Sequence, residues 1–218
     1  MTTDDAQHGE VRCEWLAIAG DVDAWKAIGL AGRDDADGSW FVPLHGTGLR
    51  IVSPAAGEDP GVIGWALSGL PAEAPSEIDG LATAAVDPVG PVFAQHELGA
   101  SAIDHVVVLT SDLSRTTGAI EAATGCELKR VREVGEMHQG FHRLGRGGLI
   151  VEVVARADVE EGPASFWGLV LNVDDLDAAC ALLGDLVGEA KDAVQPGRRI
   201  ATLRTGAGLD LPVALMST

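Results

Sequence analysis

The chain has 218 residues, 46% of them hydrophobic, which is enough for one large domain or two domains of roughly 100 residues each. Its 33 acidic residues outnumber 15 basic ones, and the formal net charge of −18 argues against nucleic acid and anionic membrane surfaces as partners. No apolar run approaches the roughly 20 residues of a membrane helix, and the polar, acidic first ten residues contain no signal peptide, so we expect a cytoplasmic protein.

The chain begins with a pattern that returns later in the sequence. Residues 13–19 predict a strand, and Asp21 predicts the N-cap of a short helix. Residues 41–52 can be laid over residues 141–152 without a gap, with matching Phe, Leu, Gly and Leu. This match indicates an internal repeat.

The next segment predicts an incomplete copy of that repeat. Residues 61–67 have the pattern of a strand, but residues 71–100 are rich in Pro, Ala and Gly and show no convincing helix. We place a domain boundary near residue 100. This divides the chain into a degenerate N-terminal domain, 1–99, and a C-terminal domain, 100–218.

The C-terminal domain opens with a complete unit, residues 102–156. Residues 103–110 predict a strand, and a helix begins after Asp112 and ends at Gly125. Three strand-like runs follow, at 127–134, 138–144 and 149–155. The order is therefore βαβββ.

A second complete unit occupies residues 164–218. A strand at 166–173 is followed by a helix that begins after Asp175 and ends at Gly184. The remaining strands are expected near 186–190, 199–204 and 211–216. The fold class is therefore α+β, built from repeated βαβββ units.

His105 and Glu152 are the candidate site residues. Each interrupts a run of β-branched and apolar residues that otherwise reads as buried strand. Burying an imidazole or a carboxylate without a partner costs several kcal/mol, so each requires a metal, a ligand or the other residue. The alternative for Glu152 is a solvent-facing glutamate or one paired with Arg130, Arg132 or Arg143.

These features resemble the vicinal oxygen chelate superfamily, which includes glyoxalases, extradiol dioxygenases and bleomycin-resistance proteins. The resemblance rests on residues 104–108, which open a strand, 111–113, which cap a helix, 149–153, which close the unit, and 172–176 in the next unit. It covers residues 102–218, and residues 10–95 are similar only as a degenerate relative. It implies cupped mixed β-sheets with helices on the outside.

The resemblance also implies a divalent metal held in the cup by the first and last strands of each unit. His105 and Glu152 stand at two such positions, but Gly168 and Ala214 stand at their counterparts in the following unit. Glu14 is a remote fourth candidate in the N-terminal domain. A catalytic metal normally has at least three protein ligands.

His142 is the candidate third ligand, because strand periodicity places it with His138 on one face of the strand before Glu152. The alternative is that both histidines point outward to solvent. Trp167, His138 and Arg143 are the candidate cavity residues. If a metal is present, these donors suit Fe, Mn, Zn, Ni or Co equally, and the protein otherwise has no cofactor.

Two functions are compatible with the sequence, besides a purely structural interaction protein with a solid, cavity-free core between the paired units. The first is a metal-dependent enzyme of lyase, isomerase or dioxygenase type acting on a small oxygen-rich metabolite, with the metal as Lewis acid. The second is a metal-free protein that binds or sequesters a small molecule or drug, in which the metal site is degenerate. Either is expected to be a monomer or a homodimer.

Overall fold

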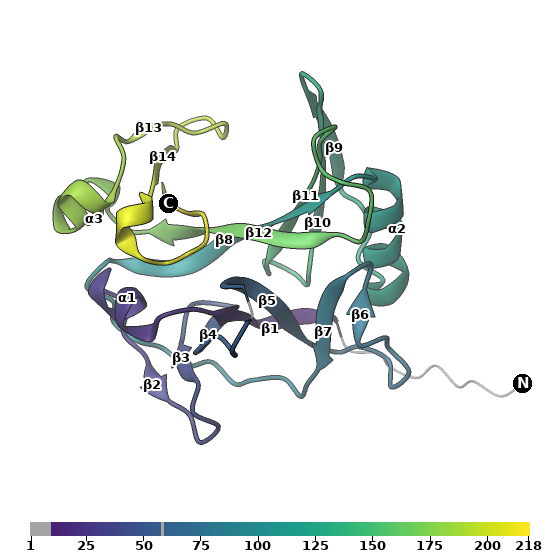
Figure 1. The fold of residues 1–218 in the computed structure, drawn as a ribbon, viewed down its shortest axis with the longest axis horizontal. Coiled ribbons are helices and arrows are strands. Elements are labelled where there is room, and N and C mark those ends of the chain that lie inside the picture. Colours follow the sequence, from purple (N-terminus) through teal and green to yellow (C-terminus); the bar gives the residue numbers. More distant parts are fainter. Residues whose placement is uncertain (1–9, 58) are drawn as a thin grey trace, which may run out of the picture.

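The computed structural model describes residues 10–57 and 59–218, and it consists of two β-sheets stacked one on the other (Figure 1). The acidic segment at residues 1–9, in which no signal peptide was expected, lies outside the described residues. Within the described residues, no helix is long and apolar enough to cross a membrane. The expected α+β class is confirmed.

The N-terminal sheet contains seven strands in the order β2-β3-β4-β1-β5-β7-β6. Its elements are β1 (Arg12–Ala19), α1 (Val22–Ala27), β2 (Arg33–Asp34), β3 (Trp40–Val42), β4 (Gly48–Val52), β5 (Gly61–Ser68), β6 (Glu77–Ile78) and β7 (Leu81–Ala85). The last strand of each half runs parallel to the first, β4 beside β1 and β7 beside β5. The second half has no helix among its described residues, as expected for an eroded unit.

The C-terminal sheet contains eight strands in the order β13-β14-β15-β12-β8-β11-β10-β9. Its first unit comprises β8 (Ala100–Thr110), α2 (Leu113–Thr124), β9 (Arg130–Val134), β10 (Met137–Arg143) and β11 (Ile150–Ala155). Its second comprises β12 (Ser165–Val173), α3 (Leu176–Leu183), β13 (Lys191–Asp192), β14 (Arg199–Thr202) and β15 (Val213–Ser217), with 3-10 turns at Gly184–Leu186 and Thr205–Ala207. Both units have the predicted βαβββ order.

The helix starts follow from the sequence. The carboxylates of Asp112 and Asp175 each accept a hydrogen bond from a backbone N–H three residues later, at 3.0 and 2.9 Å. Gly125 ends α2 with φ of 68°, which a residue with a side chain rarely adopts. The strand expected near 186–190 begins later, at Lys191, because a 3-10 turn occupies the first of those positions.

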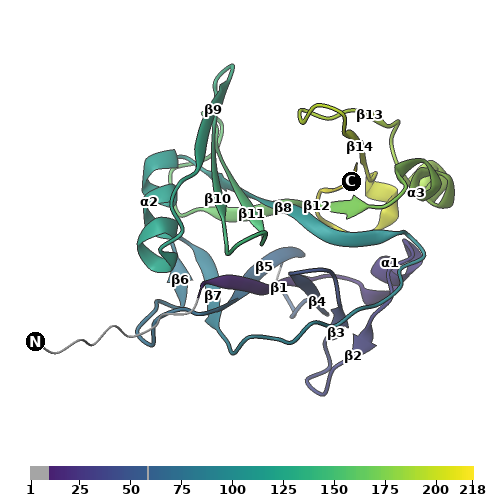
Figure 2. The same cartoon turned by 180° about the vertical axis from the view of Figure 1, so that it is seen from behind.

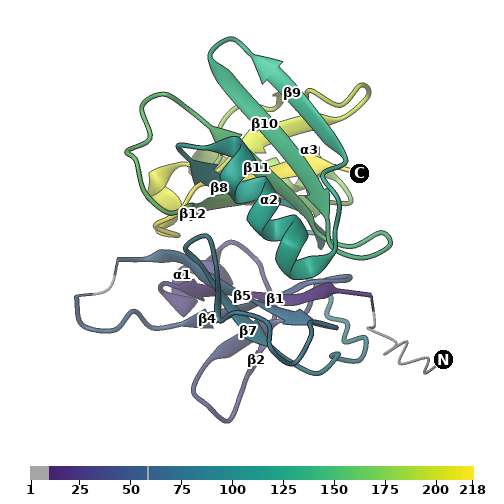
Figure 3. The ribbon, with the colours of Figure 1, turned by 90° about the vertical axis from the view of Figure 1, so that its right-hand side faces the viewer.

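The C-terminal sheet curls into a cup. The β9–β10 hairpin and the β13–β14 hairpin rise at its opposite ends, and β8 and β12 form its floor (Figures 1 and 2). The side view shows the N-terminal sheet beneath this floor, on the side away from the cup opening (Figure 3). We call the concave face of the C-terminal sheet the C-terminal cup.

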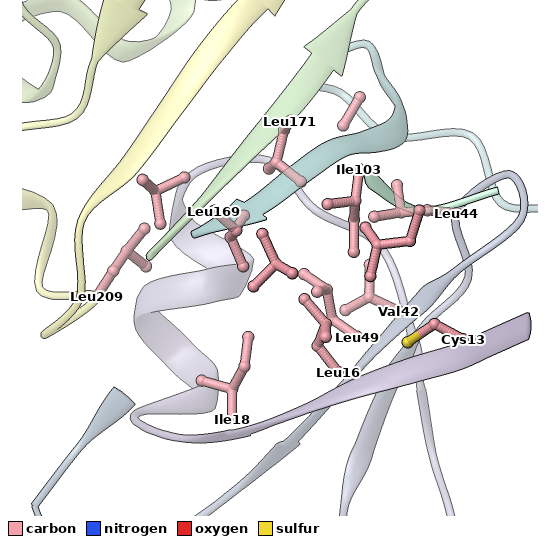
Figure 4. Close-up of a cluster of buried hydrophobic side chains, with 14 of the residues drawn as sticks. Cys13, Leu16, Ile18, Val42, Leu44, Leu49, Ile103, Leu169, Leu171 and Leu209 are labelled. Carbon is pink, nitrogen blue, oxygen red and sulfur yellow. The ribbon is translucent and has the colours of Figure 1, made fainter. Parts of the chain in front are cut away.

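The face of the C-terminal sheet that lies away from the cup packs against the N-terminal sheet. The two sheets share one hydrophobic core there (Figure 4). Leu16 and Leu49 of the N-terminal sheet are fully buried in the same cluster as Ile103, Leu169 and Leu171 of the C-terminal sheet. Alternation along each strand sends every second side chain to this core and the others to the cup. The core therefore fixes which residues face the candidate site.

Candidate functional site

Two β-bulges shape the floor of the C-terminal cup. In the antiparallel pairing of β8 with β12, Asp104 is an extra residue on β8 and Trp167 is an extra residue on β12. A bulge breaks the strict alternation of side chains, so two consecutive residues can approach the same face. Asp104 and His105 thus both line the cup.

His105 lies between two carboxylates. Its Nδ1 is 2.8 Å from Oδ2 of Asp104, and its Nε2 is 3.2 Å from Oε2 of Glu152. The two partners come from neighbouring strands, because β11 runs parallel to β8 and pairs Ile150 with His105. The predicted pairing of His105 with Glu152 is present in the structure.

Both carboxylates have further partners. The side-chain amide of Gln139 donates to Oε1 of Glu152 at 2.6 Å, and Nη1 of Arg198 donates to Oδ1 of Asp104 at 2.7 Å. Arg198 also donates to Oδ1 of Asn172 and to the carbonyl of Ser217. These contacts connect the two units of the C-terminal sheet through one polar network.

The pKa values of the two carboxyl groups are shifted in opposite directions by their surroundings. Burial alone would raise the pKa of Asp104, but hydrogen bonds from His105 and Arg198 outweigh burial and lower that pKa to about 2. Burial raises the pKa of Glu152 above its ordinary value, against the lowering influence of His105 and Arg132. Glu152 is therefore the carboxyl group of the cup that gains a proton more readily.

The polar network borders an apolar cavity of about 320 Å³, which we call the inner cavity. Trp167 stands on one side and is 46% exposed, as expected for a cavity wall. Val170 and Ala214, which belong to a small cluster separate from the main core, also line this cavity. The remaining apolar lining residues are Val107, Leu109, Met137, Val154, Ile200 and Pro212, and Leu169 and Val213 of the main core border the same cavity.

His142 lies away from the pair. It neighbours Phe141, which pairs with Glu152, so its side chain occupies the opposite face of β10. There it is 1% exposed, and its Nδ1 is 2.8 Å from the carbonyl oxygen of Cys126. Neither the third-ligand expectation nor the solvent-facing alternative describes this position.

The other two predicted cavity residues, His138 and Arg143, lie on opposite faces of β10. His138 shares the outer face of β10 with His142, and its ring is half exposed near Glu133. Arg143 shares the cup face with Phe141 and lines a second cavity of the cup. The structure therefore places Arg143 in the cup and His138 outside it.

Glu14 belongs to the other sheet. It is the extra residue of a bulge on β1, which makes it the counterpart of Asp104 rather than of His105. Its two carboxylate oxygens accept hydrogen bonds from the Ser68 hydroxyl and from the backbone N–H of Val89. Both carboxylate oxygens of Glu14 are therefore hydrogen-bonded within the N-terminal half, away from the C-terminal cup.

Gly168 gives no open space at the position equivalent to His105. A Cβ built on Gly168 would lie 2.4 Å from the carbonyl oxygen of Pro212. Within residues 10–57 and 59–218, no three His, Cys, Asp or Glu side chains come together to hold a metal. The described donors thus do not fit the metal site with at least three ligands that the resemblance implies.

Four residues of the network were missed by sequence reasoning: Asp104, Gln139, Asn172 and Arg198. Asp104 directly precedes His105, but strict alternation assigns it to the opposite face, and only the bulge reverses that. Gln139 carried a usable signal, since it lies two residues before Phe141 on the strand next to Glu152. Arg198 is remote in sequence, and nothing local marks it.

Comparisons with known proteins show the fold. No protein-family model matches the chain, and no curated protein matches it significantly. A variant of 4-hydroxymandelate synthase from Streptomyces coelicolor aligns with 15% identity and a TM-score of 0.63, covering 94% of this chain and 92% of that one. A fusion of a xylose isomerase-like TIM barrel with 4-hydroxyphenylpyruvate dioxygenase aligns with 12% identity and a TM-score of 0.63, covering 94% of this chain and 48% of that one.

A smaller match is methylmalonyl-CoA epimerase from Mycobacterium tuberculosis, with 16% identity and a TM-score of 0.46, covering 55% of this chain and 89% of that one. The two matches that span both sheets are members of the vicinal oxygen chelate superfamily. The chain has the fold of these two structures, so the fold that the resemblance implied is confirmed.

Proposed function

We propose that the C-terminal cup binds a small organic molecule that contacts His105, Glu152 and Gln139 directly, without a metal between them. The observation that carries this proposal is the 3.2 Å contact between Nε2 of His105 and Oε2 of Glu152 at the edge of an apolar cavity of about 320 Å³. The two residues expected to bind a metal, His105 and Glu152, contact each other instead. In this proposal their polar atoms therefore contact the ligand directly.

The residues that line the inner cavity determine which kind of ligand it can bind. A cavity with mostly apolar walls and a few convergent polar groups binds a ligand with an apolar body and one or two polar atoms. Oε1 of Gln139 is buried and has no hydrogen-bond partner among the described residues. A ligand hydroxyl that donates to this oxygen would remove the cost of leaving it unpaired.

Benzyl alcohol is a suitable probe, because it has an apolar ring and one hydroxyl group. Saturation-transfer NMR should detect its binding to the wild-type protein, with the same affinity before and after treatment with EDTA. Ala214→Phe should abolish binding by filling the inner cavity, whereas Val131→Phe, which adds a ring on an exposed residue of β9 outside it, should not.

The metal-dependent enzyme would give a different result. Protein purified without chelator would then contain near-stoichiometric metal that disappears in a His105→Ala, Glu152→Ala double variant. That outcome, or an absence of binding by benzyl alcohol and related neutral alcohols, would overturn the proposal.

A second candidate function is a metal-independent proton transfer. It is favoured by the continuous chain Asp104–His105–Glu152 and by the burial that raises the pKa of Glu152 above its ordinary value, a shift in the direction that a general acid or base requires. Glu152 would take a proton from a carbon next to a ligand carbonyl, which leaves the C–H electron pair in an enolate, and would return a solvent-exchanged proton to that carbon, while Gln139 holds the carboxyl group in place. Deuterium incorporation from D₂O into phenylacetone, lost in Glu152→Gln, tests this function.

A further inference from the structure

A second cavity adjoins the inner one. It has a volume of about 860 Å³ and shares His105, Gln139, Glu152 and Ile200 with the inner cavity. Residues of β9, β10, β13 and β14 line it, and the two hairpins that carry them rise at opposite ends of the cup (Figures 1 and 2). We call it the lip cavity, because it lies between the raised ends of the C-terminal cup.

Cationic side chains converge on the lip cavity. Arg130 and Arg132 of β9 pair with Phe141 and Gln139, so their side chains share the cup face with those residues. Arg143 lies two residues beyond Phe141 and therefore points to the same face. Three arginines thus form a ladder that begins next to Gln139, the residue that holds Glu152.

A fourth cation faces this ladder from the other side. Lys191 pairs with Ile200, which lines both cavities, so the lysine shares its face of the sheet. Lys129 also lines the lip cavity, but it forms a salt bridge with Glu127 at 3.0 Å. The cations of the lip that form no salt bridge therefore come from both hairpins, and one of them, Arg143, also donates to the carbonyl of Gly148 at 3.2 Å.

These cations form no salt bridge among the described residues, although Arg132 lies close enough to Glu152 to lower the pKa of that carboxyl group. Within the part of the chain that the structure describes, none of Arg130, Arg132, Arg143 and Lys191 forms a salt bridge. The acidic residues that line the lip cavity are Asp104, Glu152 and Asp192, and the first two are hydrogen-bonded within the polar network.

The local charge thus opposes the charge of the whole protein. Acidic residues outnumber basic ones by 33 to 15 in the sequence, yet five of the basic residues line this one cavity. Unpaired guanidinium groups bind phosphate and carboxylate oxygens through paired hydrogen bonds, and a lysine adds a point charge. Such a concentration of cations attracts an anion that the rest of the surface repels.

We propose that the ligand of the C-terminal cup is an anionic metabolite, whose phosphate or carboxylate group binds Arg130, Arg132, Arg143 and Lys191 in the lip cavity. Its uncharged part extends inward to His105 and Glu152. This inference rests on the proposed function and deepens it by naming the ligand class. The cations select the ligand, and the inner cavity orients it.

Isothermal titration calorimetry of the full chain at low ionic strength tests the anion site with two probes, inorganic pyrophosphate and tricarballylate. We expect saturable one-to-one binding, weakened at least tenfold in Arg130→Gln, Arg132→Gln double variant protein. Tighter binding of pyrophosphate assigns a phosphate group, and tighter binding of tricarballylate assigns a carboxylate.

Arg199→Gln is the matched control. Arg199 precedes Ile200 and pairs with Asp177 on the outside of the sheet, so its removal should change the affinity by less than twofold. The inference is overturned if neither probe binds saturably, if the double variant binds as tightly as the wild type, or if Arg199→Gln weakens binding equally.

Benzyl alcohol separates this inference from the proposed function. Because the substituted arginines do not line the inner cavity, the double variant should keep its affinity for this neutral probe while it loses the anions. If wild-type protein binds benzyl alcohol but neither anion, the anion site is refuted and the small-molecule site stands. If it binds the anions but not benzyl alcohol, the lip cavity stands and the inner site is refuted.

Discussion

Asp104 and Trp167 occupy matching bulges on the two strands that form the floor of the cup, each directly before the position where its unit would supply a metal ligand. Glu14 and Ile63 are the extra residues of two corresponding bulges between β1 and β5. All four repeats therefore keep the same local break in strand pairing, although their side chains differ. At its bulge, the carboxylate of Asp104 lies within hydrogen-bond distance of His105.

Asp104→Asn should make stability depend less on pH. A lowered folded-state pKa means that Asp104 contributes stability above its unfolded-state pKa near 4, and that this contribution is lost as the pH falls toward its folded pKa of about 2. We expect the wild type to exceed the variant by about 1–2 kcal/mol at pH 7, after allowance for solvent screening. Urea denaturation from pH 7 to pH 2 should show this difference shrinking.

Glu152→Gln should weaken the binding of benzyl alcohol but leave the free energy of unfolding almost unchanged. Burial disfavours the ionised form of Glu152, so removal of the charge should change the free energy of unfolding by less than about 1 kcal/mol. Benzyl alcohol binding should weaken several-fold, because the polar end of the cavity changes. His105→Ala is the comparison, and it should cost about 2 kcal/mol or more, since it leaves two buried carboxyl groups without their shared partner. Equal stability losses in both variants would contradict this account.

Gly168→Ala should be destabilising by at least about 2 kcal/mol. The added methyl group would meet the carbonyl oxygen of Pro212 at 2.4 Å, and this backbone contact has to shift before the side chain fits. For the same reason, Gly168→His should not restore a metal ligand. Thermal unfolding gives the stability of both variants, and cobalt titration tests the second. Gly118→Ala on α2, where a Cβ meets nothing within 4 Å, serves as the control.

Asp79→Ala should weaken the contact between the two sheets. Asp79 lies in the turn between β6 and β7, and its carboxylate accepts hydrogen bonds from Arg115 at 2.9 Å and Thr116 at 2.5 Å on α2. We expect a loss of about 2 kcal/mol in the free energy of unfolding. Asp79→Asn should lose less, because asparagine keeps an acceptor and tolerates the left-handed φ of 48° found here. Chemical denaturation of the three proteins gives this ranking.

The sequence by itself determined the repeat order, the helix starts and the pairing of His105 with Glu152. These features are local or periodic: an aspartate at each helix N-cap, a glycine at φ of 68° after α2, and alternation along strands. His105 and Glu152 meet because the first and last strands of a βαβββ unit run side by side in parallel, which the order of elements already implies.

Only the tertiary structure decided what surrounds that pair. A bulge is a mismatch between two strands, so neither strand alone shows that Asp104 reaches the cup. Arg198 reaches Asp104 across 94 positions of sequence, and the face occupied by His142 depends on the register between β10 and β11. Because each of these contacts joins elements that are distant in the chain, sequence periodicity had no means to predict them.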